Sequence, residues 1–97
     1  MKPLVSVIAI AYNHTPFIKE ALASFFSQSY DHVELIILDD ASKDDSVREI
    51  EKGIEGEDAR FIKHGKNVGY TKTFNEGLKL AAGKYVIDFA LDDVMLP

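Results

Sequence analysis

Two hydrophobic periodicities alternate along the chain. Residues 4–10 form a nearly continuous apolar run rich in β-branched side chains, which is typical of a short strand buried on both faces. Thr15 and Pro16 then offer an N-cap residue and a proline at the first helical position. Apolar side chains recur every three or four residues from there to about Gln28, which predicts an amphipathic helix.

The alternation of strand and helix patterns continues to the end of the chain. Further strands are predicted at 33–38, 60–64 and 85–90, with a helix marked by Val47, Ile50 and Ile54 and another at 71–82. The 60–64 strand alternates enough between apolar and polar residues to lie at an edge of the sheet. The residues expected to face inward from the last helix are Phe74, Leu78 and Ala81 or Ala82.

This order, in which four strands alternate with three helices, predicts an α/β fold. We expect an open, mostly parallel, Rossmann-like sheet with right-handed crossovers and helices on both faces. The 97 residues correspond to one domain or less, so residues 1–97 are expected to form a single domain. Ligands bind such sheets beyond the carboxyl ends of the strands. The polar pairs at those ends are Tyr12-Asn13, Asp39-Asp40 and Asp92-Asp93.

Composition narrows the classes of protein that fit this pattern. Hydrophobic residues make up 46% of the chain and charged residues 28%, which excludes disordered and low-complexity classes. The absence of cysteine excludes disulfide scaffolds, cysteine-based zinc sites and thiol catalysis. A net charge of −5 argues against a nucleic-acid partner, because such proteins usually carry a basic surplus. No apolar run reaches the roughly 18 residues needed to cross a bilayer.

The Asp92-Asp93 pair is a candidate metal site. Two adjacent carboxylates raise each other's pKa, and a divalent cation removes that cost. Hard oxygen ligands select Mg²⁺ or Mn²⁺, which typically also bind substrate phosphates. The alternative interpretation is a solvated turn in which Asp93 caps a following helix.

Three further residue sets are candidates for nucleotide binding. One carboxylate of Asp39-Asp40 can accept a hydrogen bond from a nucleobase or ribose while the other accepts backbone N–H groups of the 41–43 turn, or both can serve the turn alone. Tyr12 can stack on a base, or it can simply pack at the edge of the sheet. Lys72, near a helix N-terminus, can meet a phosphate or a base, or it can be a surface lysine.

Several common catalytic motifs are missing. The sequence has no G-x-x-x-x-G-K-[ST] phosphate loop, no G-x-G-x-x-G after the first strand and no G-x-S-x-G nucleophile elbow. His14, His32 and His64 are scattered and are interpreted as ordinary histidines. Asp88 interrupts an apolar strand, so it is expected to face solvent, a partner or the remainder of a larger protein.

Four blocks in order resemble family 2 glycosyltransferases with the GT-A fold. The first strand followed by Tyr12-Asn13 is similar to the family's opening strand and "Y-N" turn. Residues 28–44 resemble the block "Q-T/S-Y … E-I-I-V-V-D-D-G-S-T-D". Residues 67–77 resemble "N-x-G … N-x-G", and residues 83–97 resemble "G-x-Y-I … D-D … L-P". The four blocks together span nearly the whole chain at the family's spacing.

The resemblance implies inverting transfer of a sugar from a nucleotide-diphosphate sugar, with UDP-sugars favoured. On matching positions Tyr12 would lie against the nucleobase, and Asp40 would hydrogen-bond a uracil-type edge. Asp39 would support that turn or reach the nucleoside. Asp92 would lie near the ribose and the metal, and Asp93 would ligate the Mn²⁺ or Mg²⁺ that bridges the diphosphate.

The sequence departs from the family pattern at two places. The metal motif is often D-x-D-D, and its first Asp is Ala90 here. The family's A-R-N reads Thr73-Phe74-Asn75, so Lys72 is expected to stand in for the usual arginine.

The resemblance also implies a longer domain than 97 residues. The remaining part would hold the acceptor site and the general base, so no catalytic residue is expected here. The chain alone is expected to bind a nucleotide at most and not to catalyse sugar transfer. The sugar or lipid-linked acceptor is not specified by the sequence. The expected location is cytoplasmic, with membrane association of a full-length protein left open.

Two other interpretations are compatible with parts of the sequence. In the first, the chain is a non-catalytic fragment whose exposed last strand forms a homodimer or pairs with another chain. In the second, it is a receiver-type domain, but that class has its acidic pair after the first strand, where Tyr12-Asn13 stands here.

Overall fold

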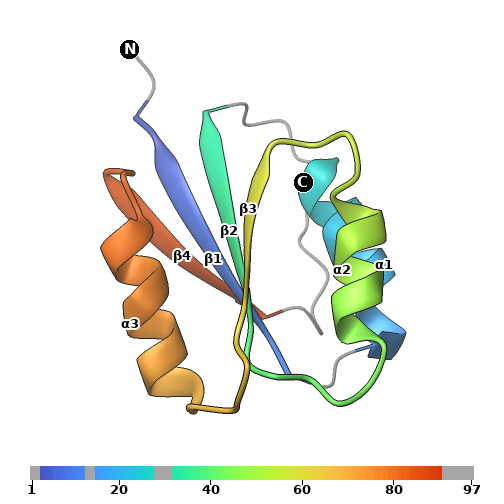
Figure 1. Ribbon diagram of the computed structural model, residues 1–97. Coiled ribbons are helices and arrows are strands. Elements are labelled where there is room, and N and C mark those ends of the chain that lie inside the picture. The colour runs from blue at the N-terminus through green and yellow to red at the C-terminus, as the bar shows by residue number, and fades with distance from the viewer. Residues whose placement is uncertain (1–2, 13–14, 28–31, 91–97) are drawn as a thin grey trace.

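The computed structural model describes residues 3–12, 15–27 and 32–90 and forms a four-stranded parallel sheet between helical layers (Figure 1). The elements are β1 (Val5–Ala11), α1 (Thr15–Phe26), β2 (Val33–Asp39), α2 (Ser46–Gly53), β3 (Ala59–Lys63), α3 (Tyr70–Leu80) and β4 (Tyr85–Ala90). The strand order is β3-β2-β1-β4, with every pair parallel. The predicted fold class is confirmed, and β3 is an edge strand as its alternating pattern indicated.

The register aligns the ends of three strands. Ala11 of β1 lies opposite Asp39 of β2, and Asp39 lies opposite Lys63 of β3. The next residue of each strand therefore reaches the same edge of the sheet. These three residues are Tyr12, Asp40 and His64.

Two separate hydrophobic clusters hold the layers together. Alternate residues of β1 and β2 pack on α1 and α2, with Ile18, Leu22 and Ile50 buried between them. The intervening residues of both strands pack on α3 through Phe74 and Leu80. Each fully buried aliphatic side chain contributes about 1.5–3 kcal/mol relative to an exposed one. This two-sided burial explains why β1 and β2 read as almost unbroken apolar runs.

Helix α3 faces the sheet differently from the prediction. Leu78 is 40% exposed, so its inward placement was wrong, whereas Thr73 and Gly77 are buried. A Cβ at Gly77 would lie 2.8 Å from Ile8 Cγ2, so the missing side chain lets the helix backbone approach the sheet. Leu78 lies about 100° further around the helix and points away from that contact line.

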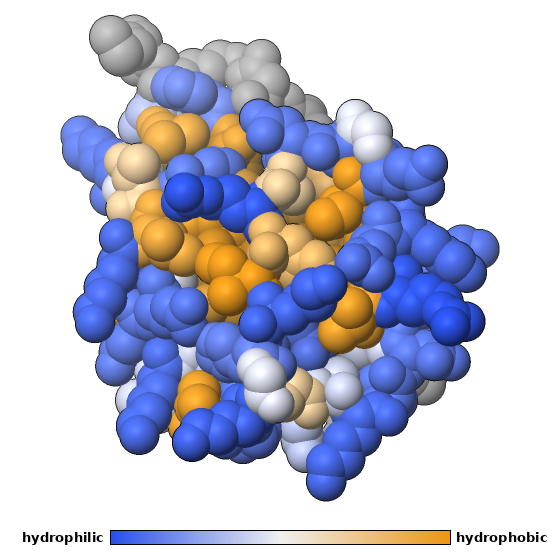
Figure 2. Space-filling view, in the orientation of Figure 1, coloured by the Kyte–Doolittle hydropathy of each residue, from blue (hydrophilic) through white to orange (hydrophobic). Residues whose placement is uncertain are grey.

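Figure 2 shows where apolar side chains reach the surface on one side of the molecule. They gather in the middle of this view, over β3 and between α3 and α2, with polar side chains around them. Phe61 and Ile62 of β3 are accordingly half-buried, one against each cluster. No helix in the described ranges is both long and apolar enough to span a bilayer.

The amino ends of the strands are tied by a compact polar network. The Ser6 hydroxyl donates to Glu34 Oε1 at 2.5 Å, and the Ala82 amide donates to the same oxygen at 2.6 Å. The Gly83 amide donates to Ser6 Oγ at 2.8 Å. Burial alone would raise the pKa of Glu34, but the Ser6 hydroxyl and these amides lower it below its usual value. The network fixes the turn between α3 and β4 at the end opposite to the candidate site.

Candidate functional site

The carboxyl edge of the sheet, at the lower end of Figure 1, brings three strand ends together. Main-chain bonds continue past the strands: the Asp40 amide donates to Ala11 O at 2.9 Å, and the His64 amide donates to Asp39 O at 2.9 Å. The start of α3 reaches the same edge, because Asp40 also contacts the residues just before it. This edge is where the α/β architecture leads us to expect a ligand.

Asp39 organises the turn that follows β2. Its Oδ2 accepts the Ser42 amide at 2.9 Å, and its Oδ1 accepts the Ser42 hydroxyl at 2.5 Å. Within this turn Ala41, directly before Ser42, has a φ of 61°. This left-handed conformation costs an alanine about 1–2 kcal/mol. The Asp39 side chain is buried, with 1% of the residue exposed. The structure thus places Asp39 where it supports the turn, as one of the sequence interpretations required.

Asp40 anchors a segment that is distant in sequence. Its carboxylate accepts the amides of Val68 and Gly69, each at 2.9 Å, and its main-chain oxygen accepts Asn67 Nδ2 at 3.1 Å. Burial acts to raise the pKa of Asp40, but hydrogen bonds from His64, Val68 and Gly69 outweigh it and lower the pKa below its usual value. Asp40 therefore holds the loop before α3 against the end of β2 as an ionised carboxylate.

His64 joins Asp40 to α3. Its Nδ1 lies 2.9 Å from Asp40 Oδ1, and its Nε2 lies 2.6 Å from Glu76 Oε1. The hydrogen bond to Asp40 raises the pKa of His64, burial opposes it, and Glu76 raises it further, so it lies above the usual 6.5. Sequence reasoning missed this cluster because it searched for partners close in sequence. His64 stands one residue past β3 as Asp40 stands one residue past β2, so the register of the two strands brings them together.

Two other predicted nucleotide-binding residues lie at the surface of this region. Tyr12 follows β1 and is 39% exposed, so its ring is accessible. Lys72 is exposed in the first turn of α3. The structure brings Asp39, Asp40 and Tyr12 to adjacent strand ends, with the loop into α3 beside them.

The predicted metal ligands Asp92 and Asp93 lie outside the described residues. Among the residues that are described, no group of three or more His, Asp or Glu side chains is arranged to hold a metal ion. Asp88, four residues before Asp92, is exposed and accepts a hydrogen bond from the Tyr70 hydroxyl. Partial burial raises the pKa of Asp88.

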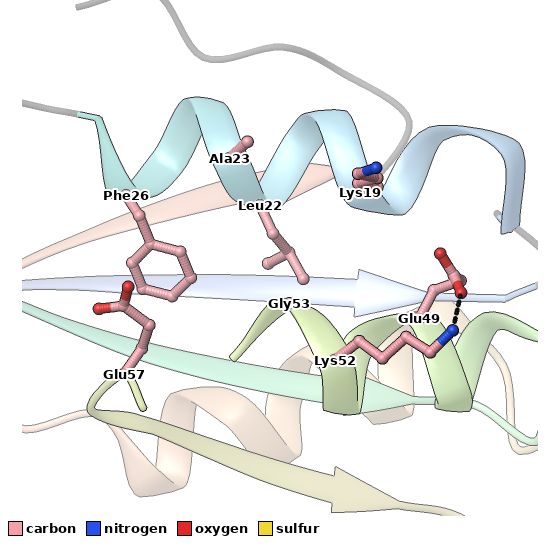
Figure 3. Close-up of a pocket in the computed structure, with 8 residues that line it drawn as sticks. All are labelled: Lys19, Leu22, Ala23, Phe26, Glu49, Lys52, Gly53 and Glu57. Atoms are coloured by element: carbon pink, nitrogen blue, oxygen red, sulfur yellow. Dashed lines mark ion pairs between the residues drawn. The ribbon is translucent and has the colours of Figure 1, made fainter. Parts of the chain in front are cut away.

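A groove of about 410 Å³ lies elsewhere, between α1 and α2 (Figure 3). Its lining residues are Lys19, Leu22, Ala23, Phe26, Glu49, Lys52, Gly53 and Glu57. Lys52 pairs with Glu49 across one turn of α2 at 3.7 Å. None of the predicted site residues lines this groove, so it does not support the nucleotide-binding prediction.

Comparison with known proteins identifies the family. A family model described as Glycosyl transferase family 2 matches residues 6–97, which include the carboxyl end of every described strand. The chain belongs to glycosyl transferase family 2. The predicted resemblance is therefore confirmed.

Relatives and solved structures agree with this membership of glycosyl transferase family 2. An uncharacterised glycosyltransferase of Haemophilus influenzae is 36% identical over 97 residues, which cover 98% of this chain and 30% of that relative. The mannosyltransferase PcManGT from Pyrobaculum calidifontis, solved with GDP-Man and Mn²⁺, superposes with a TM-score of 0.90 at 25% identity, over 97% of this chain and 29% of that one. S. aureus TarS 1–349 with UDP-GlcNAc superposes with a TM-score of 0.87 at 29% identity, over 96% and 28%. This chain thus spans about a third or less of the proteins it resembles.

Proposed function

We propose that the chain is the donor-binding part of an inverting glycosyltransferase that takes its sugar from a nucleoside diphosphate. The observation that carries the proposal is the family match over residues 6–97, which covers the whole carboxyl edge. PcManGT was solved with GDP-Man, and TarS with UDP-GlcNAc, so a nucleotide-sugar donor is the substrate class to test first. UDP-sugars are favoured by the sequence blocks. The acceptor site and the general base would belong to the rest of a longer domain.

The nucleoside is proposed to lie beside Tyr12 at the end of β1. The accessible Tyr12 ring offers a surface on which a base can stack. Asp39 would support the turn that borders the nucleoside, through its two bonds to Ser42. Lys72 would supply a positive charge from the exposed start of α3.

Asp40 needs a more specific proposal, because three internal donors already occupy its carboxylate. Val68, Gly69 and His64 all bond to its two oxygens, and only 3% of the residue is exposed. We therefore propose that Asp40 serves the nucleotide site mainly by fixing the 67–69 backbone. A direct hydrogen bond that the base donates to Asp40 stays a prediction.

The metal is proposed to be Mn²⁺ or Mg²⁺, held by Asp93 with Asp92. Two carboxylates are a hard oxygen donor set that suits either cation, and PcManGT was solved with Mn²⁺. When bound, the cation would neutralise the charge that develops on the leaving nucleoside diphosphate.

Calorimetric titration of UDP, with and without Mn²⁺, tests the proposal. The comparison needs the wild type, Asp93→Asn and a matched control, Asp58→Asn, which changes an exposed residue at the opposite end of β3. Circular dichroism first establishes that all three are folded. We expect Mn²⁺-dependent binding that is lost in Asp93→Asn and kept in Asp58→Asn. A folded wild type that binds none of UDP, GDP and dTDP would reject the donor-binding proposal for this chain.

A non-catalytic interaction module is the second candidate. The observation that favours it is the exposure of Tyr85, Val86 and Ile87 on β4, which pairs only with β1 among the described strands. Unpaired edges with apolar side chains promote association. Sedimentation of the wild type and Val86→Lys measures this directly: a homodimer abolished by the lysine supports the module, and a monomeric wild type rejects the homodimer.

A further inference from the structure

The cluster Asp40–His64–Glu76 joins three elements at the proposed nucleotide site. Asp40 stands at the end of β2, His64 at the end of β3 and Glu76 inside α3. Both imidazole nitrogens lie within hydrogen-bond distance of a carboxylate oxygen, at 2.9 and 2.6 Å. The His64 side chain is only 12% exposed and that of Asp40 only 4%, so water cannot readily replace the bond between them. The Glu76 side chain is 43% exposed, so its bond to His64 lies nearer the solvent.

The protonation of His64 follows from this geometry. An ionised carboxylate only accepts hydrogen bonds, so each imidazole nitrogen that faces one must carry a proton. A neutral imidazole has a single N–H and would turn a lone pair towards either Asp40 or Glu76. Both contacts can therefore be satisfied together only when the ring is doubly protonated.

The groups around His64 favour this charged state. Among the described residues, the charged side chains that bond to it are Asp40 at the end of β2 and Glu76 of α3, and both are acidic. Its neighbour Lys63 pairs instead with Glu51 of α2, on the other face of the sheet. The pKa of His64 is raised, first by the hydrogen bond to Asp40, which is the direction that favours the imidazolium.

We propose that doubly protonated His64 is a proton-dependent clasp that positions the 65–69 loop and the start of α3, so that nucleotide binding at this edge weakens when His64 loses its second proton. The link to nucleotide binding rests on the proposed function. The clasp itself rests on contacts within the chain: Asp40 holds the amides of Val68 and Gly69, and the Thr73 amide bonds to Gly69 O.

His64 and Glu76 act here as positioning residues, and the first test needs no ligand. NMR titration of the His64 ring in the full chain gives its protonation state, with His64→Gln assigning the signal. Hydrogen exchange of the Val68, Gly69 and Thr73 amides is followed over the same pH range and expressed as protection factors. We expect roughly tenfold or greater loss of protection as His64 deprotonates, because a bond to a charged group is broken.

Glu76→Gln separates a proton-dependent clasp from simple packing. The glutamine keeps the shape and an acceptor oxygen but removes one of the two negative charges, so the fall in protection should move to lower pH. Glu55→Gln, an exposed substitution after α2, is the matched control and should leave the profile unchanged. The proposal is overturned if His64 titrates at or below its ordinary range, or if protection stays constant while it titrates.

The second test measures UDP affinity with Mg²⁺ for the wild type and Glu76→Gln at each pH. Changes in the protonation of UDP and in its Mg²⁺ binding affect both variants equally, so they drop out of the ratio of the two affinities. We expect this ratio to change over the pH range in which His64 titrates. A constant ratio alongside changing protection would overturn the link to nucleotide binding. Absence of UDP binding at every pH would reject the proposed function of this chain and leave the clasp to be decided by exchange.

Discussion

Asp39 and Asp40 should respond very differently to the same substitution. Asp→Asn keeps the side-chain shape but replaces one acceptor oxygen with a two-hydrogen donor. Among the described residues, the Asp39 carboxylate bonds to the amide and the hydroxyl of Ser42. An asparagine at position 39 can still accept the amide through its oxygen and donate to the hydroxyl oxygen. We expect Asp39→Asn to cost below about 1 kcal/mol of unfolding free energy, because both bonds have a neutral replacement.

Asp40 has no such replacement available. Its Oδ1 accepts Val68 N and His64 Nδ1, and its Oδ2 accepts Gly69 N. An asparagine amide group would face a donor at either position, so at least one buried donor loses its partner. The charge opposite the imidazolium is lost as well. A bond to a charged group contributes about 1.5–3 kcal/mol, so we expect Asp40→Asn to cost about 2–4 kcal/mol. That is a large share of the roughly 5–15 kcal/mol that typically stabilises a domain.

Urea denaturation followed by circular dichroism measures both costs. The titration should be run near pH 6, where His64 is charged, and the slopes should match between variants so that midpoints report stability. The exposed Asp58→Asn serves as a control and should stay within about 0.5 kcal/mol of the wild type. Equal costs for Asp39→Asn and Asp40→Asn, or a cost below about 1 kcal/mol for Asp40→Asn, would refute the hydrogen-bond reasoning.

Three more predictions follow from single contacts. Gly83→Ala should destabilise the chain by about 1–3 kcal/mol in urea, because its Cβ would lie 2.5 Å from Ser6 Oγ and 2.7 Å from Ser6 N; an unchanged midpoint would contradict that contact. Ala41→Gly should stabilise it by up to about 1 kcal/mol in thermal denaturation, because glycine removes the left-handed strain at a smaller cost in unfolded-state entropy; a lower midpoint would count against strain. Because the pKa of His64 is raised, the stability that His64 contributes is complete below pH 6.5 and is lost as the pH rises through the raised pKa. Because the pKa of Asp40 is lowered, the stability that Asp40 contributes is complete above pH 3.8 and is lost as the pH falls through the lowered pKa. The urea midpoint should therefore be highest between about pH 3.8 and 6.5 and decrease at lower and at higher pH. His64→Gln should remove the decrease at higher pH.

The strands were predictable because burial on both faces leaves a direct mark on the sequence. Residues 4–10 and 33–38 needed no partner to be recognised, and the structure has strands there with bounds shifted by one residue. The order of the strands was not predicted, except that the alternation at 60–64 correctly indicated an edge strand. The position of the site region follows from the same order of elements, since all parallel strands end at one edge.

The orientation of α3 and the histidine cluster were not predictable in the same way. Leu78 fits the apolar period of the helix, and only the close approach at Gly77 decides which side faces the sheet. His64 is 24 residues from Asp40 and 12 from Glu76 in sequence. Their association depends on the β2–β3 register and on where α3 returns, neither of which appears in local spacing.

At both ends of the sheet, residues of the family motifs form hydrogen bonds within the chain. Glu34, from the block that resembles "E-I-I", accepts the Ser6 hydroxyl and the Ala82 amide. Asp40, from "D-D", accepts two loop amides and His64. These motif residues thus hold strand ends and loops in place within this chain. The groups left accessible at the carboxyl edge, Tyr12 and Lys72, are therefore where substitutions should affect ligand binding with the least effect on folding.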